Sequence, residues 1–263
     1  MDNASRLLRI LGIFDLSRPV ITPVWLVEQL GVSRASVYRD LGQLVGAGML
    51  ERVPDRGYVL GPMVVELDRQ IRLADPLLQA AEELLGRLAE ETGGTVLLCR
   101  FHGDKVMCIH QATSSRGRDP ALTVSYERGR AMPLYRGATS KVILAWLPQA
   151  TLKRLWTAER AALVAAGLPD DFGRFLDLLA VIRANGHVVT GGEVDTAAVG
   201  FAAPLRDGEH LLGSLSIVMP AASVTATVGK ITLARLLSTG GRIEGRLQDQ
   251  RDRARATRKA NNL

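Results

Sequence analysis

Residues 21–61 constrain the fold most, because two helical patterns flank a tight turn and a short hairpin pattern follows them. Gly31 can supply the positive φ that such a turn requires, and Ser33 is placed to cap the N-terminus of the second helix. Apolar residues recur at helical spacing on both sides of the turn, at Leu26 and Leu30 before it and at Val37, Leu41, Leu44 and Val45 after it. The segment therefore predicts two helices packed across one turn.

A strand pattern, a turn and a second strand pattern follow, over residues 49–53, 54–57 and 58–60. Together with the two helices, this wing predicts a winged helix-turn-helix, which places its second helix in the major groove of double-stranded DNA. Side chains able to reach base edges or phosphates lie on that helix and on the wing; they are Ser33, Arg34, Ser36, Tyr38, Arg39, Gln43, Arg52 and Arg56. A helical hairpin used only for protein contacts is the alternative interpretation.

The composition is that of an ordinary globular chain, with 47% hydrophobic and 23% charged residues over a length of 263, enough for two domains. No segment has the uninterrupted apolar length of a membrane span, and the N-terminus lacks the pattern of a signal peptide. Two cysteines cannot provide a disulfide framework. We therefore expect a cytoplasmic protein with no membrane partner.

The sequence pI of about 9.7 is compatible with nucleic-acid binding, but the excess charge lies mostly at the C-terminus. Residues 1–60 hold seven Arg against six acidic residues, whereas residues 242–263 hold six Arg and one Lys against three. The prediction of DNA binding therefore depends on where individual arginines project, and bulk charge adds little.

The patterns predict an α+β chain in four segments. Residues 1–61 form the winged domain, which a first helix around residues 7–14 completes, and residues 62–94 form linker helices, with an interruption at Pro76. Residues 95–241 form a domain with an antiparallel sheet, in which strands over 96–102 and 105–110 flank the turn Gly103-Asp104. Residues 242–263 form a basic tail that aids solubility or adds a DNA contact.

Further elements complete the predicted second domain. We expect strands over residues 121–126, 188–191, 199–205 and 211–218, and helices over residues 139–147, 152–158 and 172–184.

Several long motifs in order resemble the IclR family of bacterial transcriptional regulators over nearly the whole chain. They are DLGQLVGAGMLER and GYVLG, AEELLGRLAEETGGTVLLCRFHGDKV, RGRAMPLYRGATSKVILAWLP, and IRANGHVVTGGEVDTAAVGFAAPLRDGEHLLGSLSIVMP. The resemblance implies a ligand-responsive regulator, repressor or activator, that is a homodimer or homotetramer and binds a DNA operator. It also implies a GAF-like C-terminal domain whose small-molecule effector, an organic acid in our interpretation, alters operator affinity.

The candidate effector site combines a helix start with two further segments. Gly137, Ala138 and Thr139 precede an apolar helical run, and backbone amides at a helix N-terminus favour anions such as a carboxylate. Ser140 departs from the family's usual glycine before the lysine. Thr190, Glu193 and Asp195 lie where the sequence resembles the family's effector loop. Ser214 and Ser216 alternate on a strand and so share one face, and Gly200 replaces a cysteine of some relatives, which favours a larger or aromatic acid.

Other chemistry is less well supported. Cys99 and Cys108 fall opposite each other across the predicted hairpin, and His110 would share their face, so zinc or redox chemistry is a minor alternative to ordinary core packing. The sequence has no nucleophile elbow, metalloprotease helix, phosphate loop or dinucleotide fingerprint, which predicts no enzyme, cofactor or metal. An enzyme carrying a winged domain is the remaining alternative; measurable turnover by segment 95–241 would support it.

Overall fold

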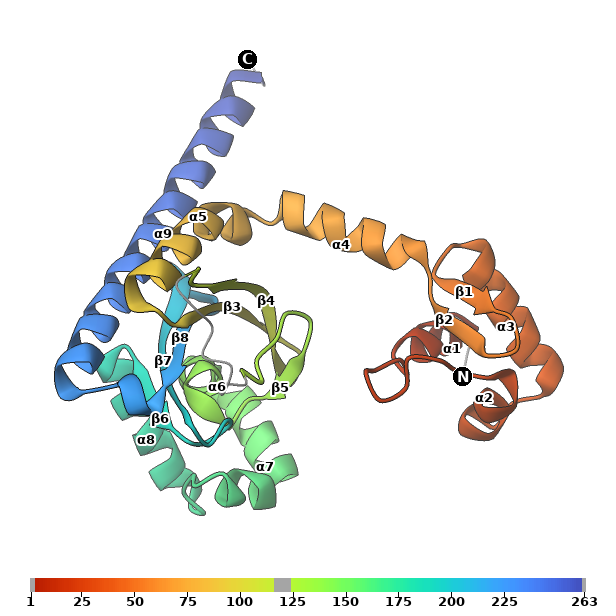
Figure 1. Ribbon diagram of the computed structural model, residues 1–263, viewed down its shortest axis with the longest axis horizontal. Helices are drawn as coiled ribbons and strands as arrows, with labels where there is room; N and C mark the ends of the chain where they lie inside the picture. Colours follow the sequence, from red (N-terminus) through yellow and green to blue (C-terminus); the bar gives the residue numbers. More distant parts are fainter. Residues whose placement is uncertain (1–2, 116–123, 262–263) are drawn as a thin grey trace. The chain divides into compact units, whose positions relative to one another are not determined.

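The computed structural model describes residues 3–115 and 124–261, and the chain divides into two compact units, Met1–Asp75 and Pro76–Leu263. Figure 1 shows the helices and strands of each unit.

The first unit is a winged helix-turn-helix, as the sequence predicts. It consists of α1 (Asn3–Leu11), α2 (Pro23–Leu30), α3 (Arg34–Gly46), β1 (Leu50–Val53), β2 (Gly57–Leu60) and α4 (Pro62–Ala74). Gly31 ends α2 with a left-handed φ of 64°, and the hydroxyl of Ser33 accepts a hydrogen bond from the Ser36 amide at the start of α3. Ile10, Leu26 and Leu41 are fully buried between the helices, so local capping and apolar packing specify the same arrangement.

The wing is fastened to the helical core by backbone contacts. Ile21 and Tyr58 exchange two backbone hydrogen bonds of 2.9 Å, which add a third segment to the β1–β2 hairpin. Gly57 has a φ of 128°, and a Cβ built on it would lie 2.3 Å from the carbonyl oxygen of Ile21. Only glycine fits this approach, which holds the wing close to the start of α2.

The second unit is built on an antiparallel sheet with the strand order β5-β4-β3-β8-β7-β6 among the described residues. The strands are β3 (Thr95–His102), β4 (Lys105–Thr113), β5 (Ala131–Pro133), β6 (Val188–Gly191), β7 (Ala198–Asp207) and β8 (His210–Pro220). Its helices are α5 (Pro76–Thr92), α6 (Gly137–Ala145), α7 (Gln149–Ala165), α8 (Phe172–Asn185), the short 3-10 turn η1 (Ala221–Ser223) and α9 (Ala226–Asn261). The expected antiparallel sheet with helices is confirmed.

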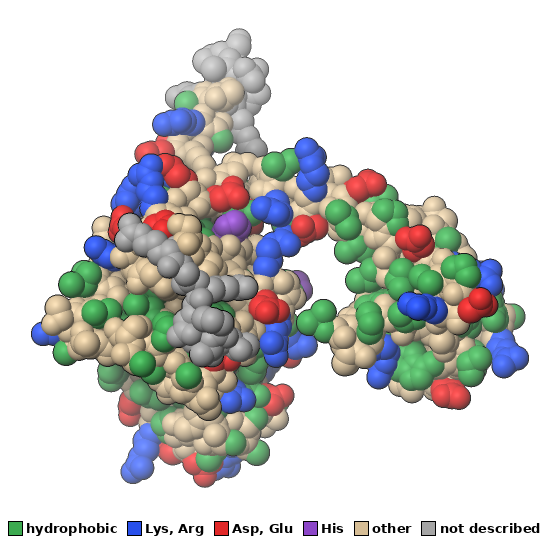
Figure 2. All heavy atoms as spheres, viewed as in Figure 1, with side chains coloured by type: hydrophobic (Ala, Val, Ile, Leu, Met, Phe, Trp, Pro, Cys, Tyr) green, Lys and Arg blue, Asp and Glu red, His purple; other side chains and the backbone are tan. Residues whose placement is uncertain are grey.

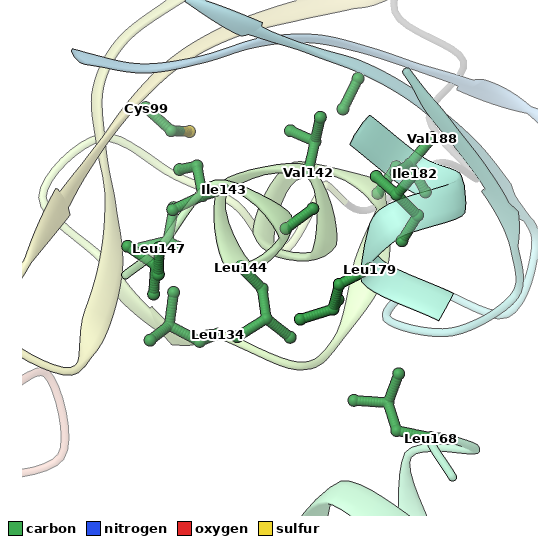
Figure 3. Packing of buried hydrophobic residues seen from close by; sticks show 14 of the residues in the cluster. Cys99, Leu134, Val142, Ile143, Leu144, Leu147, Leu168, Leu179, Ile182 and Val188 are labelled. Atoms are coloured by element: carbon green, nitrogen blue, oxygen red, sulfur yellow. The ribbon is translucent and has the colours of Figure 1, made fainter. Parts of the chain in front are cut away.

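Two apolar cores lie on opposite faces of this sheet. One is formed with α6, α7 and α8 and includes Val142, Ile143 and Leu179 (Figure 3). The other is formed with α5 and α9. Strand β8 shows the alternation directly, because Leu215 and Ile217 belong to the second core while Val218 belongs to the first.

Helices α5 and α9 differ in role from the expected linker and tail. In the described structure α5 is packed on the sheet and belongs to the second unit, because its leucines, among them Leu77, Leu84 and Leu88, are buried. Helix α9 runs through residue 242, the expected start of the tail, and buries Ile243 and Leu247 against the same sheet face. An apolar stripe thus continues into a sequence whose charge suggested a solvated end.

The strand expected over residues 121–126 is not found in its described part. Residues 121–123 lie outside the described residues, and residues 124–126 have no strand structure. The backbone amide of Ser125 donates to the carboxylate of Asp195 at 2.9 Å. A side chain thus accepts the backbone hydrogen bond that a neighbouring strand would accept in a sheet. The short strand β5 forms further along, at residues that the sequence pattern did not single out.

Candidate functional site

The exposed face of α3 carries most of the side chains that the sequence nominates for DNA contact. Arg34, Tyr38, Arg39 and Gln43 are exposed on α3, and Ser36 is half-buried in its first turn. Ser33 is committed to capping the helix, because its hydroxyl accepts from the Ser36 amide at 3.3 Å. The cap leaves the helix N-terminus ordered and accessible, which is how recognition helices approach base edges and phosphates.

The opposite face of α3 is fixed by a buried ion pair that the sequence patterns did not reveal. Asp40 is fully buried, and its carboxylate accepts two hydrogen bonds from the Arg6 guanidinium of α1, one of them Nη2 to Oδ1 at 3.0 Å. A bidentate pair of this kind has little orientational freedom. Arg6 therefore sets how α3 lies on the unit that presents it.

The wing arginines are exposed beside this helix. Arg52 lies on β1 opposite Tyr58, and Arg56 lies in the turn before Gly57. Figure 2 shows Lys and Arg side chains scattered among acidic and apolar ones over the visible face of each unit, rather than gathered in one patch. This agrees with the charge count, so DNA recognition has to come from the placement of single side chains.

A second candidate site lies where α6 begins in the C-terminal unit. A small cavity of about 30 Å³ lies against the first turn of α6, the β6–β7 loop and the sheet. Six of the eight residues nominated for effector binding line it, namely Gly137, Ala138, Thr139, Thr190, Glu193 and Asp195. Gly200 also lines it, together with Tyr126, Gly192, Val194, Ala198 and Val218, which the sequence did not suggest.

The anion-favouring end of α6 is occupied by the chain's own carboxylate. The Gly137 amide donates to Glu193 Oε2 at 3.0 Å, and Lys141 Nζ lies 2.7 Å from Glu193 Oε1. Arg136 Nη2 donates to the backbone oxygen of Glu193 at 2.8 Å. The Ala138 amide donates to Thr190 Oγ1 at 3.0 Å. The site therefore has the donors that a carboxylate needs, and an internal carboxylate holds them.

The wall beside Glu193 is a network of polar contacts around a buried tyrosine. The Tyr126 hydroxyl lies 2.6 Å from Ser140 Oγ and donates to the carbonyl oxygen of Arg136 at 2.9 Å. Burial raises the pKa of Tyr126 well above its ordinary value, so its hydroxyl is a neutral donor. Ser125 bonds both oxygens of Asp195. Ser140, the departure from the family pattern, thus serves to hold Tyr126.

The two nominated serines lie deeper than the cavity. Ser214 and Ser216 are fully buried on β8 and do not line it. Ser214 Oγ donates to the carbonyl oxygen of Thr139 at 3.3 Å, whereas Ser216 Oγ has no hydrogen-bond partner among the described residues. Both share the sheet face of Val218, which lines the cavity.

The paired cysteines are core residues. Cys99 and Cys108 are opposite each other on β3 and β4, as the two-residue turn predicts, and both are buried. Burial raises the pKa of the Cys99 thiol, which disfavours the reactive thiolate. The expected position of His110 is wrong, because a β-bulge between Leu98 and Cys99 shifts the register and puts His110 opposite Leu98. Residues 3–115 and 124–261 contain no cluster of His, Cys, Asp and Glu that could hold a metal.

Two family models match the chain. The model described as "Bacterial transcriptional regulator IclR C-terminal" matches residues 74–244, and the "IclR helix-turn-helix domain" matches residues 4–54. Among curated proteins, the transcriptional regulator KipR of Bacillus subtilis (strain 168) is 23% identical over 195 residues, which cover 74% of this chain and 76% of KipR.

Solved structures share the fold. An IclR transcriptional regulator from Alicyclobacillus acidocaldarius matches with a TM-score of 0.76 and 22% identity, covering 93% of this chain and 98% of that one. An IclR homolog from Microbacterium hydrocarbonoxydans, solved in complex with 4-hydroxybenzoate, matches with a TM-score of 0.74 and 20% identity, covering 94% and 100%. Within its described residues this chain has no helix with the length and apolarity to span a membrane.

Proposed function

Because this chain belongs to the IclR family of bacterial transcriptional regulators, we propose that it binds a specific DNA operator as a homodimer and that a small carboxylate metabolite controls this binding. The observation that carries the DNA part is the exposed, capped helix α3 beside an arginine-bearing wing. A regulator that acts on chromosomal DNA works in the cytoplasm, and we place it there.

The arginines of α3 and the wing have separable roles in this proposal. Arg34 and Arg39 lie on the helix that would enter the major groove, and Arg52 and Arg56 lie where they would meet phosphates or the minor groove. Loss of a base contact costs about 1–3 kcal/mol at the operator only, whereas loss of a phosphate contact weakens all sequences and reduces the salt dependence.

Genomic selection followed by footprinting at two salt concentrations tests this assignment. Purified protein should enrich fragments with a short protected inverted repeat, and Arg39→Ala should weaken operator binding far more than binding to unrelated DNA. Arg174→Ala is the matched control, because Arg174 is exposed on α8 of the other unit. Protection that is salt-sensitive but indifferent to sequence, in every variant, would contradict a specific operator.

The homodimer is proposed from the surface of α4. Val65 is 71% exposed and Ile71 is 62% exposed, and Leu67 is also exposed on this helix. Leu67 and Ile71 are four residues apart and so share one face of α4. An exposed apolar pair on a charged helix favours contact with a second copy, and a two-fold dimer matches an inverted-repeat operator. Sedimentation should therefore give a dimer, or a tetramer of two dimers, and Ile71→Glu should shift the equilibrium toward the monomer.

The carboxylate class of the effector is proposed from the start of α6. The Gly137 amide and the Lys141 ammonium converge there on the carboxylate of Glu193, and the Arg136 guanidinium donates to the backbone carbonyl oxygen of the same residue. The 4-hydroxybenzoate complex of the Microbacterium hydrocarbonoxydans protein adds support for an organic acid, and Gly200 favours one larger than two or three carbons.

A thermal-shift screen of organic acids and their amides tests the effector. Acids should raise the melting temperature and change operator affinity, while the matched amides should do neither. Equal responses to acids and amides would argue against a carboxylate effector, and stabilisation by two- or three-carbon acids alone would count against a large one.

A further inference from the structure

We infer that Glu193 is an internal carboxylate stopper, which fills the anion site of α6 in the effector-free protein and which an acidic effector must displace to bind. The inference rests on the proposed function for the identity of this site as the effector site. It adds how the site is kept closed and why it selects acids.

Glu193 makes the contacts that an effector carboxylate would make. One of its oxygens accepts from the Gly137 amide at 3.0 Å, and the other faces Lys141 Nζ at 2.7 Å. Lys141 is only 12% exposed, so its ammonium has little access to water apart from this pair. A carboxylate bound at this point therefore has to replace Glu193 rather than join it, because two carboxylates on one set of donors would repel each other.

The space around Glu193 supports the same conclusion. The cavity of about 30 Å³ is small beside the roughly 300–1,000 Å³ of typical ligand pockets. A wider surface hollow of about 490 Å³ lies on the other side, lined by Tyr135, Ala162 and Ala166 among others. Glu193 lines both spaces, so moving its side chain would join the cavity to the hollow and enlarge the room for a ligand.

The side chain is able to leave. Glu193 is 29% exposed and belongs to the loop between β6 and β7, whereas its partner Gly137 begins a helix buried against the sheet. Ser216 shares a sheet face with Val218 of the cavity wall, and its fully buried hydroxyl is without a hydrogen-bond partner in the described part of the chain. Buried hydroxyls are normally paired, so a ligand group that reached past Val218 would find an unused hydroxyl there.

This arrangement selects acids by exchange. When a carboxylate replaces Glu193, the Lys141 ammonium and the Gly137 amide keep an anionic partner. When a neutral molecule replaces it, the nearly buried ammonium loses its counter-charge, which is strongly unfavourable. Neutral analogues of the effector should therefore fail to open the site even when their shape fits.

Acetate tests the stopper without knowledge of the natural effector, because Glu193→Ala removes a methylene and a carboxylate, and acetate is a small molecule with the same two groups. In the full-length protein, Glu193→Ala should unfold at a lower temperature than the unsubstituted chain, and sodium acetate should restore most of the loss. Acetamide, and sodium chloride at equal ionic strength, should not. Acetate should bind this variant at least about tenfold more tightly than the unsubstituted protein, since charge-assisted hydrogen bonds are vacated.

Two further variants keep the result interpretable. Glu209→Ala, at an exposed glutamate in the β7–β8 turn, should respond to acetate as the unsubstituted chain does. Glu193→Gln keeps an acceptor for the Gly137 amide but no charge for Lys141. It serves as the test protein if the alanine variant does not fold, and it should also bind acetate more tightly than the unsubstituted chain does.

Equal acetate responses in all variants, or rescue by acetamide, would overturn the stopper. These measurements need no DNA, so they stand apart from the operator assays: the stopper can fail while specific DNA binding holds, and the reverse.

Discussion

Removal of the Asp40 carboxylate should destabilise the DNA-binding unit more than any loss of a surface charge. Asp40→Ala takes away the acceptor of two charge-assisted hydrogen bonds from the Arg6 side chain, which is only 11% exposed. Breaking a buried ion pair from one side costs about 3–5 kcal/mol. The unit spans residues 1–75, for which a stability of about 4–11 kcal/mol is typical, so the loss approaches half of it.

The assay is thermal unfolding of the full chain, combined with hydrogen exchange of peptides from α1 and α3. A loss of this size lowers the midpoint of a domain of this length by more than about 12 °C. Fast exchange should be confined to the first unit, since Asp40 belongs to that unit. Glu28→Ala is the control, because Glu28 is an exposed acid on α2 and its loss should leave the transition unchanged.

A double variant separates the charge from the packing. Arg6→Met with Asp40→Leu removes both charges and keeps apolar volume, so it should recover most of the stability that Asp40→Ala loses. A cost below about 1 kcal/mol for Asp40→Ala would mean that the pair behaves like a solvated surface pair. A double variant no more stable than the single one would equally refute the reasoning, because the cost would then not come from an uncompensated buried charge.

Three further predictions concern glycine packing, a buried hydroxyl and a buried phenol. Gly61→Ala should cost at least about 1–3 kcal/mol in unfolding experiments, because its Cβ would lie 2.3 Å from the carbonyl oxygen of Gly48, whereas Gly42→Ala, with open space around it on α3, should stabilise by about 0.5–1 kcal/mol. Ser216→Ala should leave stability unchanged or raise it slightly, since the hydroxyl has no partner among the described residues; a loss above about 1 kcal/mol in urea unfolding would contradict this. Tyr126 should stay protonated in a spectrophotometric titration at a pH where exposed tyrosines ionise, because burial raises its pKa. The unfolded chain then releases a proton that the native chain keeps, so the unfolding free energy should fall as pH rises above about 10. Ionisation of all four tyrosines together would contradict this prediction.

The parts of the fold that follow from local chemistry could be read from the sequence. Gly31 and Ser33 specify the turn and the start of α3 through their own backbone and side chain, and the two-residue turn at Gly103 specifies the pairing of Cys99 with Cys108. Such signals do not depend on distant parts of the chain. For the same reason they stop at the bulge beside Leu98, whose register shift depends on the neighbouring strands.

The parts that depend on long-range contacts could not be read in this way. Asp40 occupies a polar position on an amphipathic helix, and only the approach of Arg6, 34 residues earlier, explains its complete burial. The sequence did not indicate that Tyr126 lines the site, because its hydroxyl contacts Ser140 and the Arg136 carbonyl, 14 and 10 residues further along the chain. Helix α9 was missed as a core element because its charged surface masks the stripe that contains Ile243.

An anion site that is already filled limits how strongly an effector can act. The effector gains only the difference between its own contacts and those that Glu193 gives up, since both use the Gly137 amide and the Lys141 ammonium. The effector can also change operator affinity only by its differential affinity for the two arrangements of the protein. An effector of moderate affinity can then change operator affinity strongly only if the position of the displaced loop differs between the two arrangements of the protein. The strength of the carboxylate contact itself does not distinguish them. A Glu193→Ala protein should therefore bind acids more tightly and yet show a smaller change in operator affinity when they bind, because its site no longer has a carboxylate to displace.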